Sequence, residues 1–120
     1  MKRLIDMETV ILHNPRCGKS RQTLKLLHDK GENVQIVEYL KVCPSVKQLG
    51  EIIEKIGLKP FDVIRKGEAV YKENYKGKEL SDAEWLQVMV DNPILIERPI
   101  VIKGDKAAIG RPPEDVETIL

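Results

Sequence analysis

The sequence predicts an α/β fold with a mixed four-stranded sheet, and three observations predict it. A short apolar run at residues 10–12 is followed by a helical pattern and by a second strand pattern at residues 34–39. Two further strand patterns, at residues 99–102 and 106–109, surround a glycine turn. Residues 45–96, between these halves, are mainly helical in pattern. We therefore expect an N-terminal β-α-β unit and a C-terminal β-β-α unit that share one sheet.

The N-terminal β-α-β unit begins with a strand that is apolar on both faces, as buried central strands are. Its helix is expected over residues 22–30, with Leu24 and Leu27 on one face and Gly31 just after the last residue. The strand at residues 34–39 then returns alongside the first. Crossovers of this kind nearly always connect parallel strands, so these two strands are expected to be parallel.

The inserted helical segment contains two helix starts with the spacing of a capping box. The two pairs are Ser45 with Gln48 and Ser81 with Glu84. The first of these helices should close at Gly57, and the second should end or bend at Pro93. Between them we expect a short helix from Pro60 and a loop or loose helical turn over residues 66–80, while residues 94–96 fit either a helix or a strand.

The C-terminal unit is expected to be an antiparallel hairpin followed by a last helix that begins at Pro112. The whole order, β-α-β, helices, then β-β-α, is the layout of a thioredoxin-like domain with a helical insertion. We therefore expect residues 1–120 to form a single domain of this kind, with the insertion at residues 45–96. Pro99 suggests a cis peptide bond, because a site in this layout needs a tight turn beside the thiol.

Composition limits the classes of protein that this chain can be. It has 120 residues, 42% of them hydrophobic, which suits one domain with a packed core. Lys and Arg number 20 against 19 Asp and Glu, a balance that argues against a dedicated nucleic-acid binder. No apolar run is long enough for a membrane span, or for a signal peptide at residues 1–7, although translation could also start at Met7. We expect a cytoplasmic protein, whose thiols stay reduced.

Cys17 lies where the first strand turns into the helix. A thiol at that place is close to the free backbone N–H groups of a helix start, and the helix dipole and nearby cations favour its thiolate form. Arg16, Lys19 and Arg21 lie within four residues of it. We therefore predict that Cys17 is a nucleophile.

The residues around Cys17 also argue against other chemistries. Ser20 stands where a Cys-x-x-Cys motif would have its second cysteine, so a redox cycle would need an outside thiol, such as glutathione, or Cys43. Thr23 stands where a cysteine phosphatase loop would have its arginine. Cys43 also fits a small apolar residue before a proline. The cysteines and histidines complete no metal-ligand spacing, so no bound metal is expected.

Three arginines lie at the ends of predicted elements: Arg65, Arg98 and Arg111. Arginine binds tetrahedral oxyanions well, because its guanidinium donates two parallel hydrogen bonds. Gathered around a thiol, these side chains would bind an oxyanion and lower the pKa of the thiol. The alternative is that each forms an ordinary solvated surface contact. In the same way, His13 fits either a site residue or a hydrogen-bonded structural histidine.

Four motifs in the sequence form a recognisable set: His-Asn-Pro-x-Cys-Gly-x-Ser-Arg at residues 13–21, Ile-Arg-Lys at 64–66, Asn-Pro-Ile-Leu-Ile-x-Arg-Pro-Ile-Val at 92–101 and Gly-Arg-Pro at 110–112. In these motifs the sequence resembles the glutaredoxin-dependent arsenate reductases of the thioredoxin-like superfamily. The resemblance runs from about residue 11 to residue 120. It implies that Cys17 is the catalytic nucleophile and that His13 is the histidine linked to its low pKa. Arg65, Arg98 and Arg111 would bind the oxyanion, and Asn14, Gly18, Ser20, Arg21 and Pro99 would shape the loops of the site.

The resemblance also implies a reaction and its partners. The Cys17 thiolate would attack arsenate, glutathione would enter as co-substrate without any bound cofactor, and arsenite would leave. Glutaredoxin would then reduce the remaining disulfide between Cys17 and glutathione. Neither a nucleic acid nor a membrane is expected as a partner. Two alternatives stay open: a redox-sensing regulator that binds RNA polymerase, and a thiol reductase of the same family with another substrate.

Overall fold

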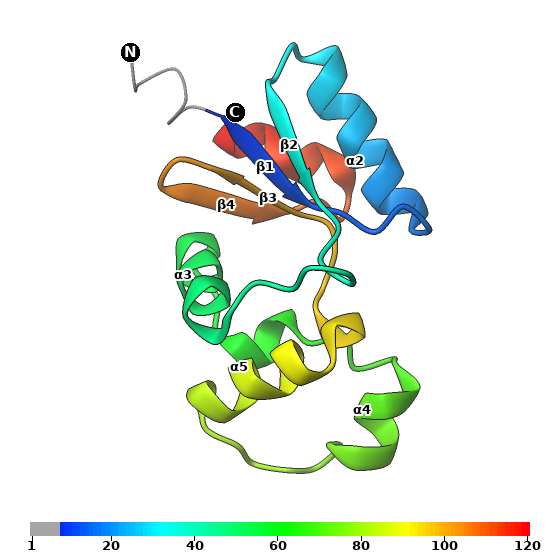
Figure 1. Cartoon of the computed structure of the whole chain (residues 1–120), viewed down its shortest axis with the longest axis vertical. Helices are drawn as coiled ribbons and strands as arrows, with labels where there is room; N and C mark the ends of the chain where they lie inside the picture. The colour runs from blue at the N-terminus through cyan, green and yellow to red at the C-terminus, as the bar shows by residue number, and fades with distance from the viewer. Residues whose placement is uncertain (1–7) are drawn as a thin grey trace. The chain divides into compact units, whose positions relative to one another are not determined.

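The structure is a computed structural model of the chain and describes residues 8–120 (Figure 1). The expectations about residues 1–7, namely no signal peptide and a possible start at Met7, lie outside the described residues. The chain forms two compact units. The first combines the chain up to Val42 with Arg98–Leu120, and the second is Cys43–Glu97, close to the helical insertion that the sequence predicts.

The first unit is built on a mixed four-stranded sheet, as predicted. Its strands are β1 (Thr9–Leu12), β2 (Val34–Val37), β3 (Ile100–Lys103) and β4 (Lys106–Ile109), in the order β2-β1-β3-β4. β1 pairs in parallel with β2 and antiparallel with β3, and β3 pairs antiparallel with β4. In this register Ile11 lies between Ile36 of β2 and Val101 of β3.

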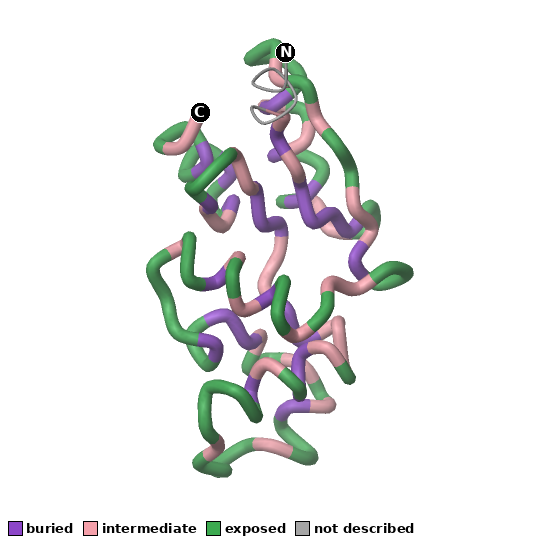
Figure 2. The backbone as a smooth tube through the Cα atoms, turned by 60° about the vertical axis from the view of Figure 1, so that its left-hand side comes forward, coloured by how far each residue is buried: buried purple, intermediate pink, exposed green. Residues whose placement is uncertain are grey.

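Two helical elements, α2 (Gly18–Asp29) and η3 (Pro113–Ile119), pack together in the first unit. The core beneath them contains Ile11 of β1, Leu27 of α2, Val101 of β3 and Val116 of η3, each with no solvent exposure. Buried residues, which are purple in Figure 2, lie in β1 and β3 but not in β2. Because Ile11 and Val101 are paired across neighbouring strands, they project from the same face of the sheet.

The first unit differs from the sequence prediction in the bounds of some elements and in the type of its last helix. α2 begins at Gly18 instead of residue 22, so that Cys17 itself is the N-cap residue. β2 ends at Val37 instead of residue 39, because the chain turns there and the Lys41 and Val42 N–H groups both donate to the Glu38 carbonyl. The last element is a 3₁₀ helix, the tighter form that short helical segments often adopt.

The second unit is entirely helical apart from one bridge. Its elements are α3 (Val46–Ile56), η1 (Pro60–Val63), α4 (Ala69–Asn74), α5 (Asp82–Asp91) and η2 (Pro93–Leu95). Both predicted capping boxes are present, at Ser45 and Ser81. The segment predicted as a loop or loose turn contains the short helix α4.

The core of the second unit lies where α3, η1 and α5 pack together. Leu49, Ile53, Val63 and Met89 are at most 1% exposed. The Trp85 and Phe61 rings pack against each other in a tilted arrangement, with their centroids 5.0 Å apart. The ambiguous residues 94–96 form the end of η2 and a single antiparallel bridge between Ile96 and Ile64. Among residues 8–120, none of the helices has both the length and the apolar character to span a bilayer.

Candidate functional site

The loop between β1 and α2 is held by its own backbone and side chains. The Cys17 N–H donates to the Asn14 carbonyl at 3.0 Å, and the Arg16 N–H donates to the Asn14 Oδ1 at 3.0 Å. Arg21 reaches back from α2 and donates from Nη1 to the Pro15 carbonyl at 2.9 Å. These bonds form a tight turn, which places Cys17 at the start of α2.

Cys17 is the N-cap residue of α2, but its side chain does not form the hydrogen bond that a usual N-cap side chain forms with the helix backbone. The thiol is half-buried, and burial by itself raises its pKa. The Ser20 N–H, the Arg98 guanidinium and the Lys19 N–H oppose burial, and the net effect is a pKa below that of an ordinary thiol. The unpaired N–H groups of the helix start thus favour the thiolate, as the sequence position of Cys17 suggests.

His13, Asn14 and Ser20 form a buried cluster beside Cys17. The Ser20 hydroxyl lies 2.6 Å from His13 Nδ1 and accepts the Asn14 N–H at 3.1 Å, and Ser20 has no solvent exposure. Burial lowers the pKa of His13, Glu38 opposes this, and Arg21 adds to it, with a net lowering. A lowered pKa favours the neutral ring, whose Nδ1 can accept the Ser20 hydroxyl proton.

Arg98 and Arg111 both belong to the first unit, and each precedes a cis proline. The Arg98–Pro99 bond is cis, as predicted, and so is Arg111–Pro112, which the sequence analysis did not anticipate. Arg98 is half-buried and its guanidinium hydrogen-bonds the Cys17 thiol. Arg111 is exposed directly after β4. Of the three predicted arginines, the structure thus brings Arg98 to the nucleophile.

Arg65 lies in the second unit, after η1, and is held by two carboxylates there. Its Nη1 lies 2.7 Å from Glu97 Oε1, and its Nε lies 3.3 Å from Glu68 Oε2. Burial by itself lowers the pKa of Arg65, but Glu97 and Glu68 raise it overall. Neither partner is among the residues predicted from the sequence. The i+3 spacing of Glu68 is a local signal for this pair, whereas no local signal points to Glu97.

Cys43, the first residue of the second unit, has the opposite electrostatic character to Cys17. It is half-buried, and burial raises the pKa of its thiol. Both cysteines are free thiols. The structure therefore supports the reading of Cys43 as a small, weakly reactive residue.

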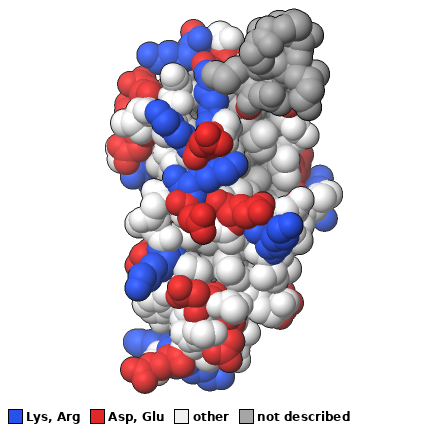
Figure 3. Space-filling view, turned by 90° about the vertical axis from the view of Figure 1, so that its left-hand side faces the viewer, with Lys and Arg blue, Asp and Glu red and all other residues white. Residues whose placement is uncertain are grey.

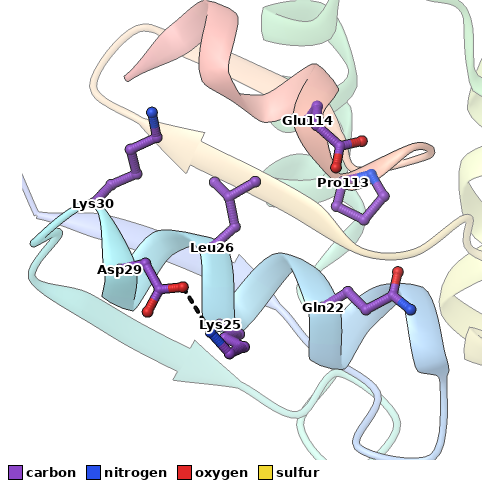
Figure 4. Close-up of a pocket in the computed structure, with 7 residues that line it drawn as sticks. All are labelled: Gln22, Lys25, Leu26, Asp29, Lys30, Pro113 and Glu114. Atoms are coloured by element: carbon purple, nitrogen blue, oxygen red, sulfur yellow. Dashed lines mark hydrogen bonds and ion pairs between the residues drawn. The ribbon is translucent and has the colours of Figure 1, made fainter.

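Several hollows have volumes between about 420 Å³ and 640 Å³. One of them lies in the first unit between α2 and η3, and none of the predicted site residues lines it. Its lining is Gln22, Lys25, Leu26, Asp29, Lys30, Pro113 and Glu114 (Figure 4). Lys25 pairs with Asp29 at 2.8 Å within the same helix. We therefore do not assign this hollow to the site around Cys17.

The distribution of charged and metal-ligating side chains also bears on the chemistry of the site. On the face drawn in Figure 3, acidic and basic side chains are interspersed, in keeping with 20 basic and 19 acidic residues. Within residues 8–120, no three His, Cys, Asp or Glu side chains gather closely enough to hold a metal ion. The arrangement around Cys17 suits nucleophilic attack by a thiolate on an electrophile that an adjacent guanidinium can hold.

Known proteins resemble this chain over nearly its whole length. The model of the ArsC family matches residues 12–119. An arsenate reductase of Haemophilus influenzae is 46% identical over 116 residues, which are 95% of this chain and 100% of that protein. An uncharacterized protein of Escherichia coli is 44% identical over 112 residues, which are 92% of this chain and 94% of that protein.

A solved structure shares both sequence and fold with this chain. The arsenate reductase from Vibrio cholerae superposes with a TM-score of 0.91 at 44% identity, covering 95% of this chain and 98% of its own. This likeness confirms the predicted thioredoxin-like fold. Since the family match and these relatives span nearly the whole chain, the chain belongs to the ArsC family.

Proposed function

We propose that this protein is an arsenate reductase in which Cys17 is the nucleophile, glutathione is the co-substrate and glutaredoxin is the final reductant. The observation that carries the proposal is the Cys17 thiol at the N-terminus of α2, with the Ser20 and Lys19 N–H groups and the Arg98 guanidinium directed at it. Relatives at 40% to 46% identity that are named arsenate reductases support the choice of substrate.

The first step is attack of the Cys17 thiolate on As(V). An S–As bond forms, and an arsenate oxygen leaves as hydroxide or water after taking up a proton. Arg98 would hold an arsenate oxygen beside the thiolate, and Arg111 and Arg65 would complete the oxyanion site. His13 would act through Ser20 on the start of α2, since its Nδ1 bonds the Ser20 hydroxyl at 2.6 Å. Asn14, Gly18, Arg21 and Pro99 would shape the loops around the reacting atoms.

The second step supplies the electrons. A glutathione thiolate attacks the Cys17 sulfur, an S–S bond forms, and the electron pair of the breaking S–As bond stays on arsenic. Arsenic leaves as arsenite in the As(III) state, and the two thiols have been oxidised to one mixed disulfide. A glutaredoxin thiolate then attacks the glutathione sulfur and releases the Cys17 thiolate. The proposed cycle uses an external thiol, since Ser20 stands at the position of a second cysteine and Cys17 cannot close a disulfide at that spacing.

In this proposal residues 1–120 act as a single thioredoxin-like domain. Arg98 and Arg111 belong to the first unit and Arg65 to the second. The proposal also places the protein in the cytoplasm, where reduced glutathione is abundant. No bound cofactor is part of the proposal.

The test of the proposed function is arsenite formation by the purified protein with arsenate, glutathione and glutaredoxin. We expect turnover that needs both thiol reagents, that is lost in Cys17→Ser and that is kept in the matched variant Cys43→Ser. Activity that survives in Cys17→Ser would rule out the mechanism. No turnover of arsenate, together with capture of RNA polymerase subunits by the purified chain, would favour the regulator instead.

The arginine roles have their own test. Arg65→Lys and Arg111→Lys should each raise the KM for arsenate about tenfold or more, because lysine cannot donate two parallel hydrogen bonds to one oxyanion. Arg16→Lys is the matched control, since Arg16 is exposed and its backbone, not its guanidinium, is bonded in the loop. An unchanged KM in both site variants would remove Arg65 and Arg111 from the proposal.

A further inference from the structure

Gly110 occupies a place in the first unit that has no room for a side chain. It is buried and lies just after β4, directly before Arg111. A Cβ atom there would lie 2.6 Å from Thr23 Oγ1, 3.2 Å from Thr23 Cγ2 and 2.9 Å from Pro99 Cγ. Its φ lies outside the left-handed region, so the requirement for glycine comes from space and not from backbone conformation.

The atoms around Gly110 cannot easily move aside. Pro99 is a closed ring with no rotamer that withdraws Cγ. Thr23 has no solvent exposure and is β-branched in a helix, where few χ1 rotamers are open to it. Its hydroxyl also donates to the Lys19 carbonyl at 2.8 Å. Any atom added at Gly110 therefore has to shift Pro99 or Thr23.

Both neighbours of Gly110 lead directly to the nucleophile. Pro99 follows Arg98, whose guanidinium hydrogen-bonds the Cys17 thiol, and the Gly110 N–H donates to the Pro99 carbonyl at 2.9 Å. Thr23 is bonded to Lys19 in the first turn of α2, and the Lys19 N–H is directed at the same thiol. Gly110 thus lies where the segment that carries Arg98 packs against α2.

We propose that Gly110 is a positioning residue, whose missing side chain lets Pro99 and the first turn of α2 close together and so holds the Arg98 guanidinium against the Cys17 thiol. This inference deepens the proposed function, on which it rests for the role of Cys17. The added methyl of alanine would push Pro99 and α2 apart. The Arg98 guanidinium and the Cys17 thiol would then separate by several tenths of an ångström. A charge-assisted hydrogen bond loses strength over such a distance, so the thiolate would lose part of its stabilisation.

The test is the pH dependence of Cys17 alkylation, which involves no arsenate. In a Cys43→Ser background, iodoacetamide reacts with Cys17 alone, and its rate follows the thiolate fraction. We expect Gly110→Ala to shift the midpoint of the rate profile to higher pH. A rise of one pH unit would lower the rate about tenfold on the acid side of the profile. Gly67→Ala is the matched control, because a Cβ there meets nothing within 4 Å.

A double-mutant cycle with Arg98 separates positioning from general damage to the fold. If Gly110 acts through Arg98, Gly110→Ala should shift the midpoint much less in an Arg98→Ala background than alone. A folded Gly110→Ala protein with the midpoint of the Gly67→Ala control would overturn the inference. So would an equal shift with and without Arg98.

A second pair of variants covers the case in which Gly110→Ala does not fold. Gly110→Ala with Thr23→Ala removes both contacts to Thr23 and leaves the one at 2.9 Å to Pro99. Its midpoint should still lie above that of Thr23→Ala alone, and equal midpoints would overturn the inference. Because alkylation does not depend on the substrate, a shifted midpoint in a protein that does not reduce arsenate would leave the inference standing and reject only the proposed function.

Discussion

The two thiols of the chain differ in the charges and N–H groups around them. Burial raises the pKa of Cys43 and nothing opposes it, whereas at Cys17 the Ser20 N–H and the Arg98 guanidinium more than offset burial and lower the pKa. We therefore expect iodoacetamide at neutral pH to label Cys17 many times faster than Cys43, as measured by mass spectrometry of the peptides. Equal labelling of the two would contradict this account of the site.

The Arg98 contribution can be separated within the same experiment. Arg98→Ala removes both the hydrogen bond and the positive charge that favour the thiolate. The rate of Cys17 labelling at pH 6 should fall, while that of Cys43 should not change, so the second thiol is an internal control. An unaltered Cys17 rate would mean that the helix N–H groups alone activate the thiol.

His13 is the second residue whose surroundings change its protonation. Burial lowers its pKa, so its imidazole should titrate below the ordinary histidine value of about 6.5. The folded protein then binds fewer protons than the unfolded chain in that range, and the free energy of unfolding should decrease as the pH falls from about 6.5 toward the lowered pKa.

The measurement for His13 is an NMR titration of a His28→Gln variant, which leaves one imidazole in the chain. A midpoint below 6.5 is expected. A midpoint at or above 6.5 would mean that the attraction of Glu38 outweighs burial. It would also remove the argument for a neutral ring that accepts the Ser20 hydroxyl proton.

At the scale of elements, α2 differs from α3 and α5 in how it begins. Ser45 and Ser81 each accept the N–H three residues on, and Gln48 and Glu84 return the bond. α2 begins at Cys17 without such a box. The backbone N–H groups that a capping side chain would bond are thus available to the Cys17 thiol. The missing cap makes the start of α2 less stable but leaves these groups free to favour the thiolate.

The cap of α3 has a measurable effect on stability. Ser45→Ala leaves the Gln48 N–H without its acceptor, which lies at 3.1 Å in the native protein. The free energy of unfolding should fall by about 1 kcal/mol in urea denaturation. Ser45→Asp is the matched variant, because a carboxylate also caps a helix start, and it should keep most of the stability. Equal losses in the two variants would show that the cap is not the cause.

At the scale of the whole molecule, a cluster around Glu32 links the start of β1, the end of β3 and the segment before β2. The Glu32 Oε1 accepts the Thr9 hydroxyl at 2.6 Å and the Lys103 ammonium at 2.9 Å, from β1 and β3, just before β2 begins. The Thr9 hydroxyl and Lys103 lower the pKa of Glu32. The carboxylate is only 14% exposed, so solvent screens the cluster little.

The Glu32 cluster should make stability depend on acid. Because the folded pKa is lowered, its contribution is complete above the unfolded value of about 4.3 and is lost as the pH falls through the folded pKa. Glu32→Gln should cost about 1–3 kcal/mol at pH 7 and should reduce the acid dependence of unfolding below pH 5. Glu51→Gln, at an exposed position of α3, is the control, and an identical acid dependence in both variants would exclude Glu32 as a cause.

Much of the fold could be predicted because its signals are local. The apolar run before Cys17, the glycine turn between β3 and β4 and the Ser45 and Ser81 caps all act within a few residues, and the structure contains each of them. The start of α2 was predicted four residues late, because no usual capping residue marks it. The family match confirms the resemblance that the motifs suggested.

The sequence by itself thus determined the order of elements, the strand-to-helix position of Cys17, the absence of a second cysteine at Ser20 and the family. Only the tertiary structure decided which distant groups meet: Arg98 at the thiol, Arg65 with Glu97, and Gly110 against Thr23 and Pro99. The physical reason is the separation in sequence between the residues that interact. Helix and turn preferences depend on neighbours within about four residues, whereas these contacts join segments that are close only because the chain has folded.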